Sequence, residues 1–247
     1  MKYCPLARNS CVVYAAPLNS IRGVHEQVFC GSSRSLARQI TDALPTLHHR
    51  LHKVPPMNGI TVDLGGGGRP TYLDILKING SFFNLDRVEE AKPSLVGDLE
   101  QPFPLATESI NNTILFSTLE HIFGYQHVVD EMARILKTGG SAVVCVPFIF
   151  PFHTHETEAF LINDYFRYSA SALDRIFRSA GFKDVIVEPM GGVGLVIAEF
   201  MGYIVRFRFL RFLLAIFGLT LQATIETFRP NTSATRYPLA YFVTAVK

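Results

Sequence analysis

Four consecutive glycines, Gly65 to Gly68, follow a short apolar run at residues 60–64. An apolar run of this length, bounded by turn residues, is typical of a buried strand. Glycine adopts backbone conformations that other residues avoid, and it leaves no side chain between the backbone and a neighbouring group. The sequence therefore predicts a buried strand that ends in a turn, with a ligand lying directly against the turn.

The residues around this turn narrow the class of ligand. A turn that binds a pyrophosphate spaces its glycines G-x-G-x-x-G, but Pro70 occupies the third glycine position here. Asp63 precedes the glycines, where its carboxylate suits an amine or another cation better than a phosphate. Asp86 follows a second apolar run, at the position from which a carboxylate accepts hydrogen bonds from ribose hydroxyls. A ribose together with a positive charge favours S-adenosylmethionine over a dinucleotide.

Five segments, in order along the chain, resemble the class I S-adenosylmethionine-dependent methyltransferases, in the small-molecule branch similar to methyltransferase type 11. The likeness covers residues 58–190 and returns at the last strand; its segments are residues 62–67, Asp86, 97–105, 117–122 and 131–140. It implies an α/β fold with a Rossmann-like, doubly wound sheet of seven mostly parallel strands and an antiparallel last strand. It also implies transfer of a methyl group from S-adenosylmethionine to a small, lipid-linked or glycan-linked acceptor.

The resemblance also implies a cofactor site at the carboxyl ends of the strands, where ligands bind in open α/β sheets. The residues that it assigns to this site are Asp63, Gly65, Gly66 and Gly67 at the methionine end, Asp86 at the ribose, Asp98 and Leu99 at the adenine, and Ser117 in the same crevice. The alternative is a binding or scaffold protein that keeps the methyltransferase fold without catalysis. Arg69 and Pro70 leave room for it, because many relatives continue the turn with small residues.

The loop at residues 147–169 follows the fifth predicted strand at the cofactor edge of the sheet and is rich in aromatic and titratable side chains. If the acceptor is a hydroxyl, a general base is needed, and a histidine is suited to this role near neutral pH. The candidate bases are His153 or His155, with His121 next. The alternative is that both loop histidines only anchor the loop through hydrogen bonds. Residues 164–168 resemble a D-Y-F-R-Y run of relatives in glycan and lipid pathways, in which Arg167 orders the loop by pairing with a carboxylate.

The segment at residues 193–225 is almost entirely apolar and aromatic, with three interspersed arginines. Its sequence leaves several interpretations open: peripheral contact with a membrane interface, a roof over an apolar acceptor pocket, a homodimer surface, or a buried helical cap within the monomer. No run reaches the roughly 18 uncharged apolar residues that predict a membrane-spanning helix.

Composition limits the other function classes. A formal net charge of +2 does not favour nucleic-acid binding, which normally needs a clustered basic surface. The four cysteines lack paired metal-ligand spacing, and the histidines at 48, 49 and 52 are interpreted as a solvated helix end, so no metal site is predicted. Pro5, Arg8 and Asn9 interrupt the N-terminal apolar run, which does not resemble a signal sequence. A reducing, cytoplasmic location is expected, with membrane association as an addition.

The predicted domain organisation has four parts. These are an N-terminal arm and helix at residues 1–57, a cofactor-binding core at 58–190, an apolar helical insertion at 191–237 and the last strand at 238–247. Within the core, the apolar spacing predicts an amphipathic helix at residues 125–137 that ends at Gly139 and Gly140. A second helix is predicted to begin at a serine cap, Ser169 or Ser171, and to stop at Gly181.

Overall fold

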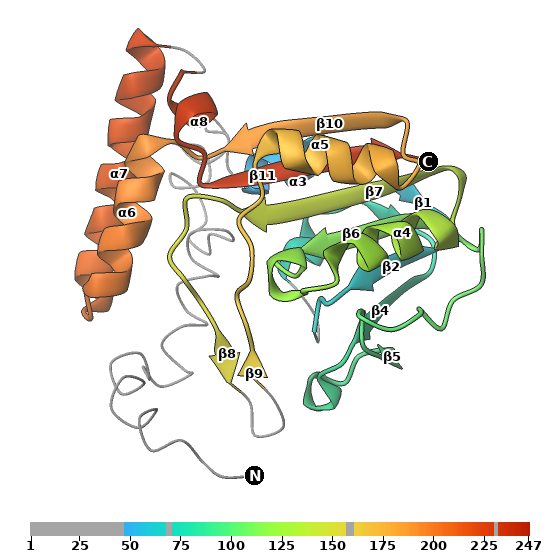
Figure 1. Ribbon diagram of the computed structural model, residues 1–247. Coiled ribbons are helices and arrows are strands. Elements are labelled where there is room, and N and C mark those ends of the chain that lie inside the picture. The colour runs from blue at the N-terminus through green and yellow to red at the C-terminus, as the bar shows by residue number, and fades with distance from the viewer. Residues whose placement is uncertain (1–46, 68–70, 157–160, 230–231) are drawn as a thin grey trace.

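A computed structural model of the chain describes residues 47–67, 71–156, 161–229 and 232–247. Its centre is a seven-stranded sheet in the order β10-β11-β7-β6-β2-β4-β5 (Figure 1). Strand β11 pairs antiparallel with β7 and β10, and the other neighbours pair in parallel. This confirms the predicted sheet. The strands are β2 (Thr61–Leu64), β4 (Phe82–Asp86), β5 (Leu95–Val96), β6 (Ile110–Phe116), β7 (Leu136–Pro147), β10 (Asp184–Met190) and β11 (Ala240–Val246).

Helices cover both faces of this sheet. Helices α4 (Tyr125–Ile135) and α5 (Ala170–Ser179) pack on one face, together with Ala142 and Val144 of β7. Helix α3 (Leu47–Lys53) packs on the opposite face, against Val143 and Cys145 of the same strand. Successive side chains of a strand point to opposite faces, so an apolar run without alternation suits a strand that is covered on both sides.

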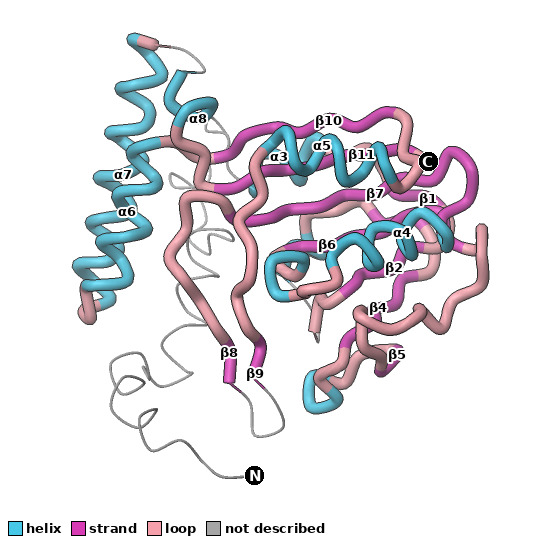
Figure 2. The backbone as a smooth tube through the Cα atoms, in the orientation of Figure 1, coloured by secondary structure: helices cyan, strands magenta, loops and turns pink. Residues whose placement is uncertain are grey.

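The remaining elements are short or lie outside the main sheet. They are β1 (Met57–Asn58), β3 (Ile78–Asn79), β8 (His155–Glu156), β9 (Leu161–Ile162), the 3₁₀ helices Thr71–Asp74, Glu89–Ala91 and Leu119–His121, and the helices α6 (Val193–Ile204), α7 (Arg208–Phe228) and α8 (Thr232–Arg236). Two long loops join β7 to β8 and β9 to α5 (Figure 2). Helices α6 and α7 form an antiparallel hairpin on the side to which the parallel strands point (Figure 1).

The structure differs from the predicted helix at residues 125–137. Helix α4 ends at Ile135, and β7 begins at the next residue because Leu136 pairs with Ile110 of β6. Gly139 and Gly140 extend β7 and exchange backbone hydrogen bonds of 3.0 Å with Lys247, so they do not cap the helix. A strand partner that is distant in sequence overrides the local capping signal.

Two other expectations are met in part. The sequence of residues 71–77 also predicts a short helix, which the structure reduces to one 3₁₀ turn. The helical spacing of apolar residues from Ser33 past Pro45 predicts a kinked or two-piece helix before the first strand. Of this helix the described residues contain α3, and the rest lies outside them. The second core helix agrees with its prediction: Ser169 Oγ accepts the backbone N–H of Ala172 at 3.3 Å, and Gly181 follows the helix with φ 98°.

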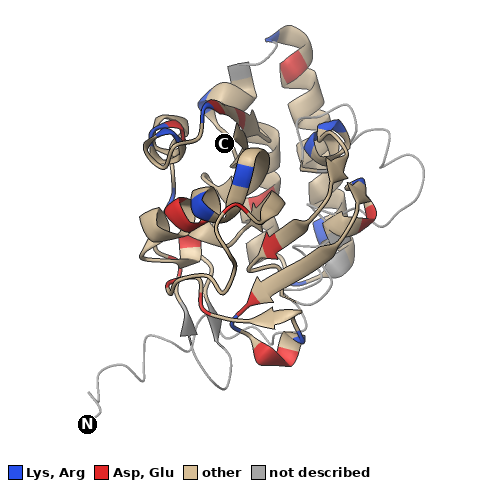
Figure 3. Ribbon diagram, turned by 90° about the vertical axis from the view of Figure 1, so that its right-hand side faces the viewer, with Lys and Arg blue, Asp and Glu red and all other residues tan. Residues whose placement is uncertain are grey.

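Helices α6, α7 and α8 form the segment between β10 and β11. The boundaries of the four parts of the chain stay a prediction. Helix α7 contains an apolar stretch, Phe209–Phe228, that is long and apolar enough to cross a membrane, with a mean hydropathy of 1.5. The search for an uncharged run misses it because Arg211 and Glu226 interrupt the stretch. Figure 3 shows few charged residues along this helix.

Candidate functional site

The glycine turn directly follows β2. In the sheet β2 lies between β4, the next strand of the sheet along the chain, and β6, so the strand order reverses at β2. Gly65 has φ 79°, and a Cβ on it would overlap the side chain of Thr118, so this position requires glycine. The N–H of Gly67, with φ 62°, donates to Asp86 Oδ2 at 2.8 Å. Asp86 Oδ1 accepts the N–H of Val88 at 2.8 Å. The carboxylate of Asp86 thus joins the turn to the end of β4.

A cavity of about 260 Å³ opens beside this turn. Five of the predicted cofactor residues line it: Gly65, Asp86, Asp98, Leu99 and Ser117. The walls also contain residues to which the sequence assigned no cofactor role: Arg87, Val88, Gly97, Glu100, Thr118, His121 and Ile122. Asp63, Gly66 and Gly67 are not among the lining residues. The cavity follows the rule that ligands bind where the strand order reverses in an open α/β sheet.

Ser117 ends β6 in an unusual backbone conformation. Its φ is 48°, in the left-handed region that non-glycine residues seldom occupy, and its N–H donates to the carbonyl oxygen of Cys145 at 2.9 Å. Backbone strain of this kind concentrates at functional sites, where the surrounding structure holds it in place. The position of Ser117 in the cavity wall fits that pattern.

Asp63 lies beneath the turn. Its side chain is fully buried, its Oδ2 accepts the hydroxyl of Tyr72 at 2.6 Å, and a Cβ on Gly66 would overlap its carboxylate. Among the described residues its Oδ1 has no hydrogen-bond partner. Burial raises the pKa of Asp63 to about 7; the hydrogen bond from Tyr72 opposes this rise, and the charge of Asp86 adds to it. Asp63 therefore supports the turn from below, and its assignment to the methionine end of the cofactor stays a prediction.

Replacing Asp63 with asparagine is expected to stabilise the ligand-free protein increasingly as the pH rises. Because the pKa in the folded state is about 7, above the ordinary 3.8, the contribution of Asp63 to stability is greatest below pH 4 and is lost as the pH rises to about 7. Asparagine cannot ionise and avoids this loss, which amounts to at most about 4 kcal/mol. Denaturant unfolding between pH 4 and 8 measures the difference.

The control for this prediction is Asp74→Asn, which changes an exposed acid on the neighbouring 3₁₀ helix. Its free energy of unfolding, measured at the same pH values, is the baseline against which that of Asp63→Asn is compared. A difference between Asp63→Asn and the unchanged protein that stays constant from pH 4 to 8 would contradict the proposed ionisation.

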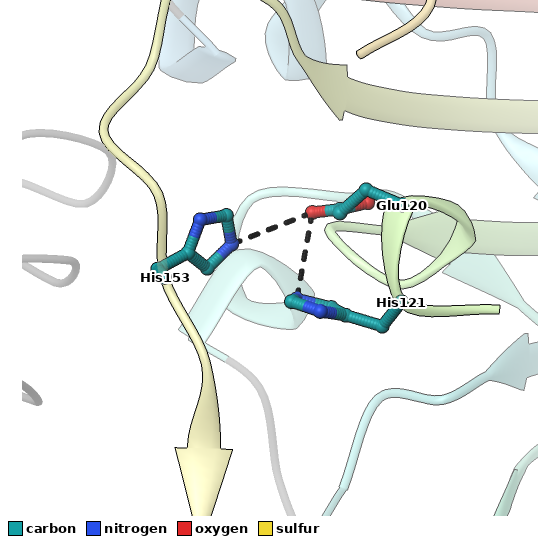
Figure 4. A group of neighbouring side chains, drawn as sticks. All are labelled: Glu120, His121 and His153. Carbon is teal, nitrogen blue, oxygen red and sulfur yellow. Dashed lines mark ion pairs between the residues drawn. The ribbon is translucent and has the colours of Figure 1, made fainter. Parts of the chain in front are cut away.

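A carboxylate and two imidazoles meet beside the cavity (Figure 4). Glu120 and His121 lie in the 3₁₀ helix that follows β6, and His153 lies in the loop that follows β7. Nε2 of His121 and Nε2 of His153 are each 3.8 Å from Glu120 Oε1. The two rings meet edge to face, with centroids 4.9 Å apart. His121 also lines the cavity, so this cluster borders the predicted cofactor site.

Hydrogen bonds fix the tautomer of both histidines. Nδ1 of His121 is 2.7 Å from the carbonyl oxygen of Asn163, and Nδ1 of His153 is 3.1 Å from that of Pro151. A carbonyl oxygen only accepts hydrogen bonds, so each Nδ1 carries a proton and donates. Each Nε2, the atom that faces Glu120, is therefore the nitrogen that carries the lone pair when its imidazole is neutral. In that form the cluster offers two proton acceptors beside the cavity.

Asp164 and Arg167 hold the loop that carries His153. Asp164 Oδ2 accepts the backbone N–H of His153 at 2.9 Å and lies 3.2 Å from its Nδ1. Arg167 pairs with both oxygens of Asp164 and also donates to the carbonyl oxygens of Phe166 and Pro151. Burial alone would raise the pKa of Asp164, but the hydrogen bonds from Arg167 and His153, with their charges, lower it below the usual range. The pairing of Arg167 with a carboxylate agrees with the resemblance.

Helix α6 packs next to the loop that carries His153, through Phe150. Phe150 contacts the ring of His153, at a centroid distance of 5.2 Å, and the ring of Tyr203 in α6, at 6.1 Å. Glu199 of α6 is buried, and burial raises its pKa to about 7, although the charges of Arg211 and His153 act in the opposite direction. The hairpin is therefore in contact with the loop that carries the candidate base.

The sequence candidates and the structure agree only in part on this cluster. His121 and His153 come together; the backbone of His155 lies in β8, and its side chain lies outside the described residues. Glu120 and Glu199 have no role among the residues predicted from the sequence. Glu120 lies within the segment at residues 117–122, where an acid next to a histidine was a usable signal, whereas no local pattern marks Glu199.

One protein-family model matches part of the chain, and many solved structures have a similar fold. Residues 64–144 match the model described as a methyltransferase domain. No curated protein matches the chain in sequence. A methyltransferase from Archaeoglobus fulgidus has 14% identity and a TM-score of 0.54, with 92% of this chain and 99% of that chain covered. A Haloferax volcanii methyltransferase, solved with the Trm112 activator, has 20% identity and a TM-score of 0.52, with 92% of each chain covered.

Phosphoethanolamine N-methyltransferase 2 from Haemonchus contortus, solved with S-adenosylhomocysteine, has 16% identity and a TM-score of 0.53. The alignment covers 90% of this chain but only 56% of that one, so this chain spans little more than half of its length. At these identities the solved structures establish the fold alone. The family model identifies residues 64–144 as a methyltransferase domain, of the class I type that uses S-adenosylmethionine as its cofactor.

Proposed function

We propose that the enzyme methylates a hydroxyl group on a lipid-linked acceptor at a membrane surface. The observation that carries this proposal is the α6–α7 hairpin, which contacts the candidate catalytic loop on one side and exposes apolar side chains on the other. A small soluble acceptor would not need such a surface.

The hairpin is a close-packed unit fixed to the core. A Cβ on Gly194 would overlap the backbone of α7 near Gly218, and one on Gly218 would overlap Ala198, so the two helices approach as closely as glycine permits. Gln222 Oε1 accepts the N–H of Gly194 at 3.1 Å. Leu195 packs with Phe150 and Leu239 of the core. These contacts support a rigid orientation of the exposed face.

The outward side of the hairpin is apolar. Only 11% of the apolar stretch in α7 is buried, and Phe207 and Phe209 at the turn are 75% and 73% exposed. The other exposed apolar side chains are Ile197, Phe200, Met201, Tyr203, Ile204, Leu210, Phe212, Leu213, Ile216, Phe217 and Phe228. Contiguous apolar surface of this kind marks an interaction site, because water solvates it poorly.

Geometry favours a hairpin that lies in the membrane interface over one that spans the membrane. Helix α6 has 12 residues and is about 18 Å long, less than the roughly 30 Å of a bilayer core. Both outer ends of the hairpin return to the sheet, through β10 and α8. Arg206 lies in the turn, where such a side chain can reach lipid phosphates.

The proposed reaction uses the groups that surround the cavity. The acceptor hydroxyl would approach from the hairpin side and the sulfonium methyl group from the cavity, in line with each other. Nε2 of His153 would take the hydroxyl proton as the methyl group moves to oxygen, and the cofactor would leave as a neutral thioether. Holding the reactants close and aligned supplies most of the rate in such a displacement. Phe150 and the hairpin would keep water away from the reacting atoms.

Vesicle binding tests the membrane part of this proposal. We expect the protein to float with anionic vesicles of phosphatidylcholine and phosphatidylglycerol. The double variant Phe207→Ser and Phe209→Ser should bind at least tenfold more weakly, since burying each phenylalanine contributes about 1.5–3 kcal/mol when it is complete. Methyl-tritiated S-adenosylmethionine, incubated with the protein and vesicles of a total lipid extract, should label the organic phase.

The matched control is Ile186→Ser with Tyr237→Ser, which removes two exposed apolar side chains that lie outside the hairpin. It should float like the unchanged protein. Failure of the intact protein to float, or label found only in water-soluble products, would refute the lipid-linked acceptor and favour a soluble one.

A further inference from the structure

We propose that Glu120, His121 and His153 bind a divalent metal ion next to the cofactor cavity. One oxygen of Glu120 and one nitrogen of each histidine lie within 4.8 Å of one another. The three groups come from two separate loops, and their ligand atoms point toward a common centre (Figure 4). The local sequence does not predict this site, because 31 residues separate His121 from His153 and no ligand-spacing motif joins them.

Glu120 has a buried carboxylate that lacks a hydrogen-bond donor among the described residues. Its side chain is completely buried, and among the described residues neither carboxylate oxygen receives a hydrogen bond. The two Nε2 atoms lie 3.8 Å from its Oε1, beyond hydrogen-bond distance. Buried carboxylates are normally paired with a donor or a metal, because burial without a partner is unfavourable. A cation between the three groups would supply that partner.

The orientation of the two histidine rings also suits a metal ion. Nδ1 of each histidine lies within hydrogen-bond distance of a carbonyl oxygen, which leaves Nε2, the nitrogen nearest Glu120, as the atom that can bind a cation. A cation between Oε1 of Glu120 and the two Nε2 atoms would therefore meet three ligand atoms. Histidine ligands of metals typically donate their other ring N–H to a carbonyl or a carboxylate, which orients the ring. Asn163, Pro151 and Asp164 supply such oxygens here.

The ligand set indicates the class of metal. Two imidazoles and one carboxylate suit Zn²⁺ and other first-row divalent ions, and they leave positions open for exogenous oxygen ligands. A tetrahedral Zn²⁺ with bonds of about 2.1 Å needs ligand atoms about 3.4 Å apart. The two Nε2–Oε1 distances are 3.8 Å, and all three ligand atoms lie within 4.8 Å of one another, so side-chain rotations must draw them together to close the site.

The inference rests on the proposed function only in the role that it gives to the ion. His121 also lines the cofactor cavity, so an acceptor oxygen bound to the ion would lie close to the methyl group. A bound divalent ion lowers the pKa of a coordinated hydroxyl, whose proton then passes to water. The methyl group would move from sulfur to this oxygen and leave the thioether. With the ion bound, both histidines act as ligands, and the role of His153 as a base applies to the metal-free enzyme.

Direct metal binding tests the site without any acceptor. Protein stripped with a chelator and titrated with Zn²⁺ is expected to bind one equivalent, and Co²⁺ should produce visible absorption bands typical of mixed nitrogen and oxygen ligands. Glu120→Gln and His153→Gln should each lower the Zn²⁺ affinity by at least tenfold to a hundredfold. His52→Gln, which changes an exposed histidine on α3, is the matched control and should leave the affinity unchanged. Calorimetry with S-adenosylmethionine verifies that each variant is folded.

The outcomes separate this inference from the proposed function. Tight Zn²⁺ binding that Glu120→Gln and His153→Gln abolish supports the site, even if vesicle lipids are not methylated. No stoichiometric binding by the stripped protein, or equal loss of binding in His52→Gln, overturns the site. Methylation of lipids that proceeds at the same rate in excess chelator overturns the role of the ion in the reaction and leaves the proposed function intact.

Discussion

Replacing His153 with glutamine is expected to lower the rate of methyl transfer by about 10²- to 10⁴-fold, the usual contribution of a positioned general base. Glutamine cannot accept a proton as an imidazole does, and it also lacks the nitrogen that would bind a metal ion. Cofactor binding should change little, because His153 is absent from the walls of the cavity. Single-turnover rates with labelled S-adenosylmethionine, beside calorimetric affinity for the cofactor, measure the two effects separately.

The control for this experiment is again His52→Gln, which should turn over at the normal rate. A His153→Gln protein that is folded and fully active would show that the loop histidine only anchors the loop. An equal loss of rate and of cofactor affinity would show instead that the variant disturbs the whole site, since Asp164 and Arg167 share the hydrogen bonds of this loop.

Replacing Asp86 with alanine is expected to weaken the binding of S-adenosylmethionine by tenfold to a hundredfold or more. A hydrogen bond to a charged group contributes about 1.5–3 kcal/mol, and each 1.4 kcal/mol changes an affinity tenfold. The variant would lose the carboxylate that is predicted to bind the ribose. It would also lose the acceptor that holds the N–H of Gly67 and with it the shape of the turn. Calorimetric titration with S-adenosylmethionine and with S-adenosylhomocysteine gives the change in affinity.

Two further variants serve as comparisons for Asp86→Ala. Asp86→Asn keeps one acceptor oxygen for the turn and should lose less affinity than alanine. Asp184→Ala removes an exposed acid at the start of β10 and should bind the cofactor normally. An unchanged affinity in Asp86→Ala would refute the assignment of this carboxylate to the cofactor and would direct attention to Asp98 on the opposite part of the cavity wall.

The convergence of residues that follow the parallel strands was predictable. Parallel strands carry their carboxyl ends to one edge of the sheet, so polar residues that directly follow such strands converge there. Gly65, Asp86, Asp98 and Ser117 do converge on one cavity. Asp63 behaves differently, because all four residues of β2 are buried and no alternation indicates where its carboxylate points. Its contact with Tyr72, on the opposite face from α4 and α5, becomes visible only in the folded chain.

The acceptor side was less predictable. Glu120 and His153 meet because the 3₁₀ helix after β6 and the loop after β7 leave neighbouring strands at the same edge. Candidate histidines could be chosen by type, but their tautomers depend on carbonyl oxygens of Asn163 and Pro151 that no sequence pattern reveals. The same holds for Glu199, which is brought toward the catalytic loop by the packing of α6 on Phe150 and Leu239.

The sequence by itself determined the fold class, through its resemblance to a known family, and the position of the glycine turn, because this turn depends on a local apolar run and on residues with special backbone freedom. Only the tertiary structure decided where helix α4 ends, which groups face Glu120 and which side of the α6–α7 hairpin is exposed. Each of these depends on contacts between segments that are distant in the chain. Such contacts set burial and hydrogen-bond partners, which local sequence constrains only weakly.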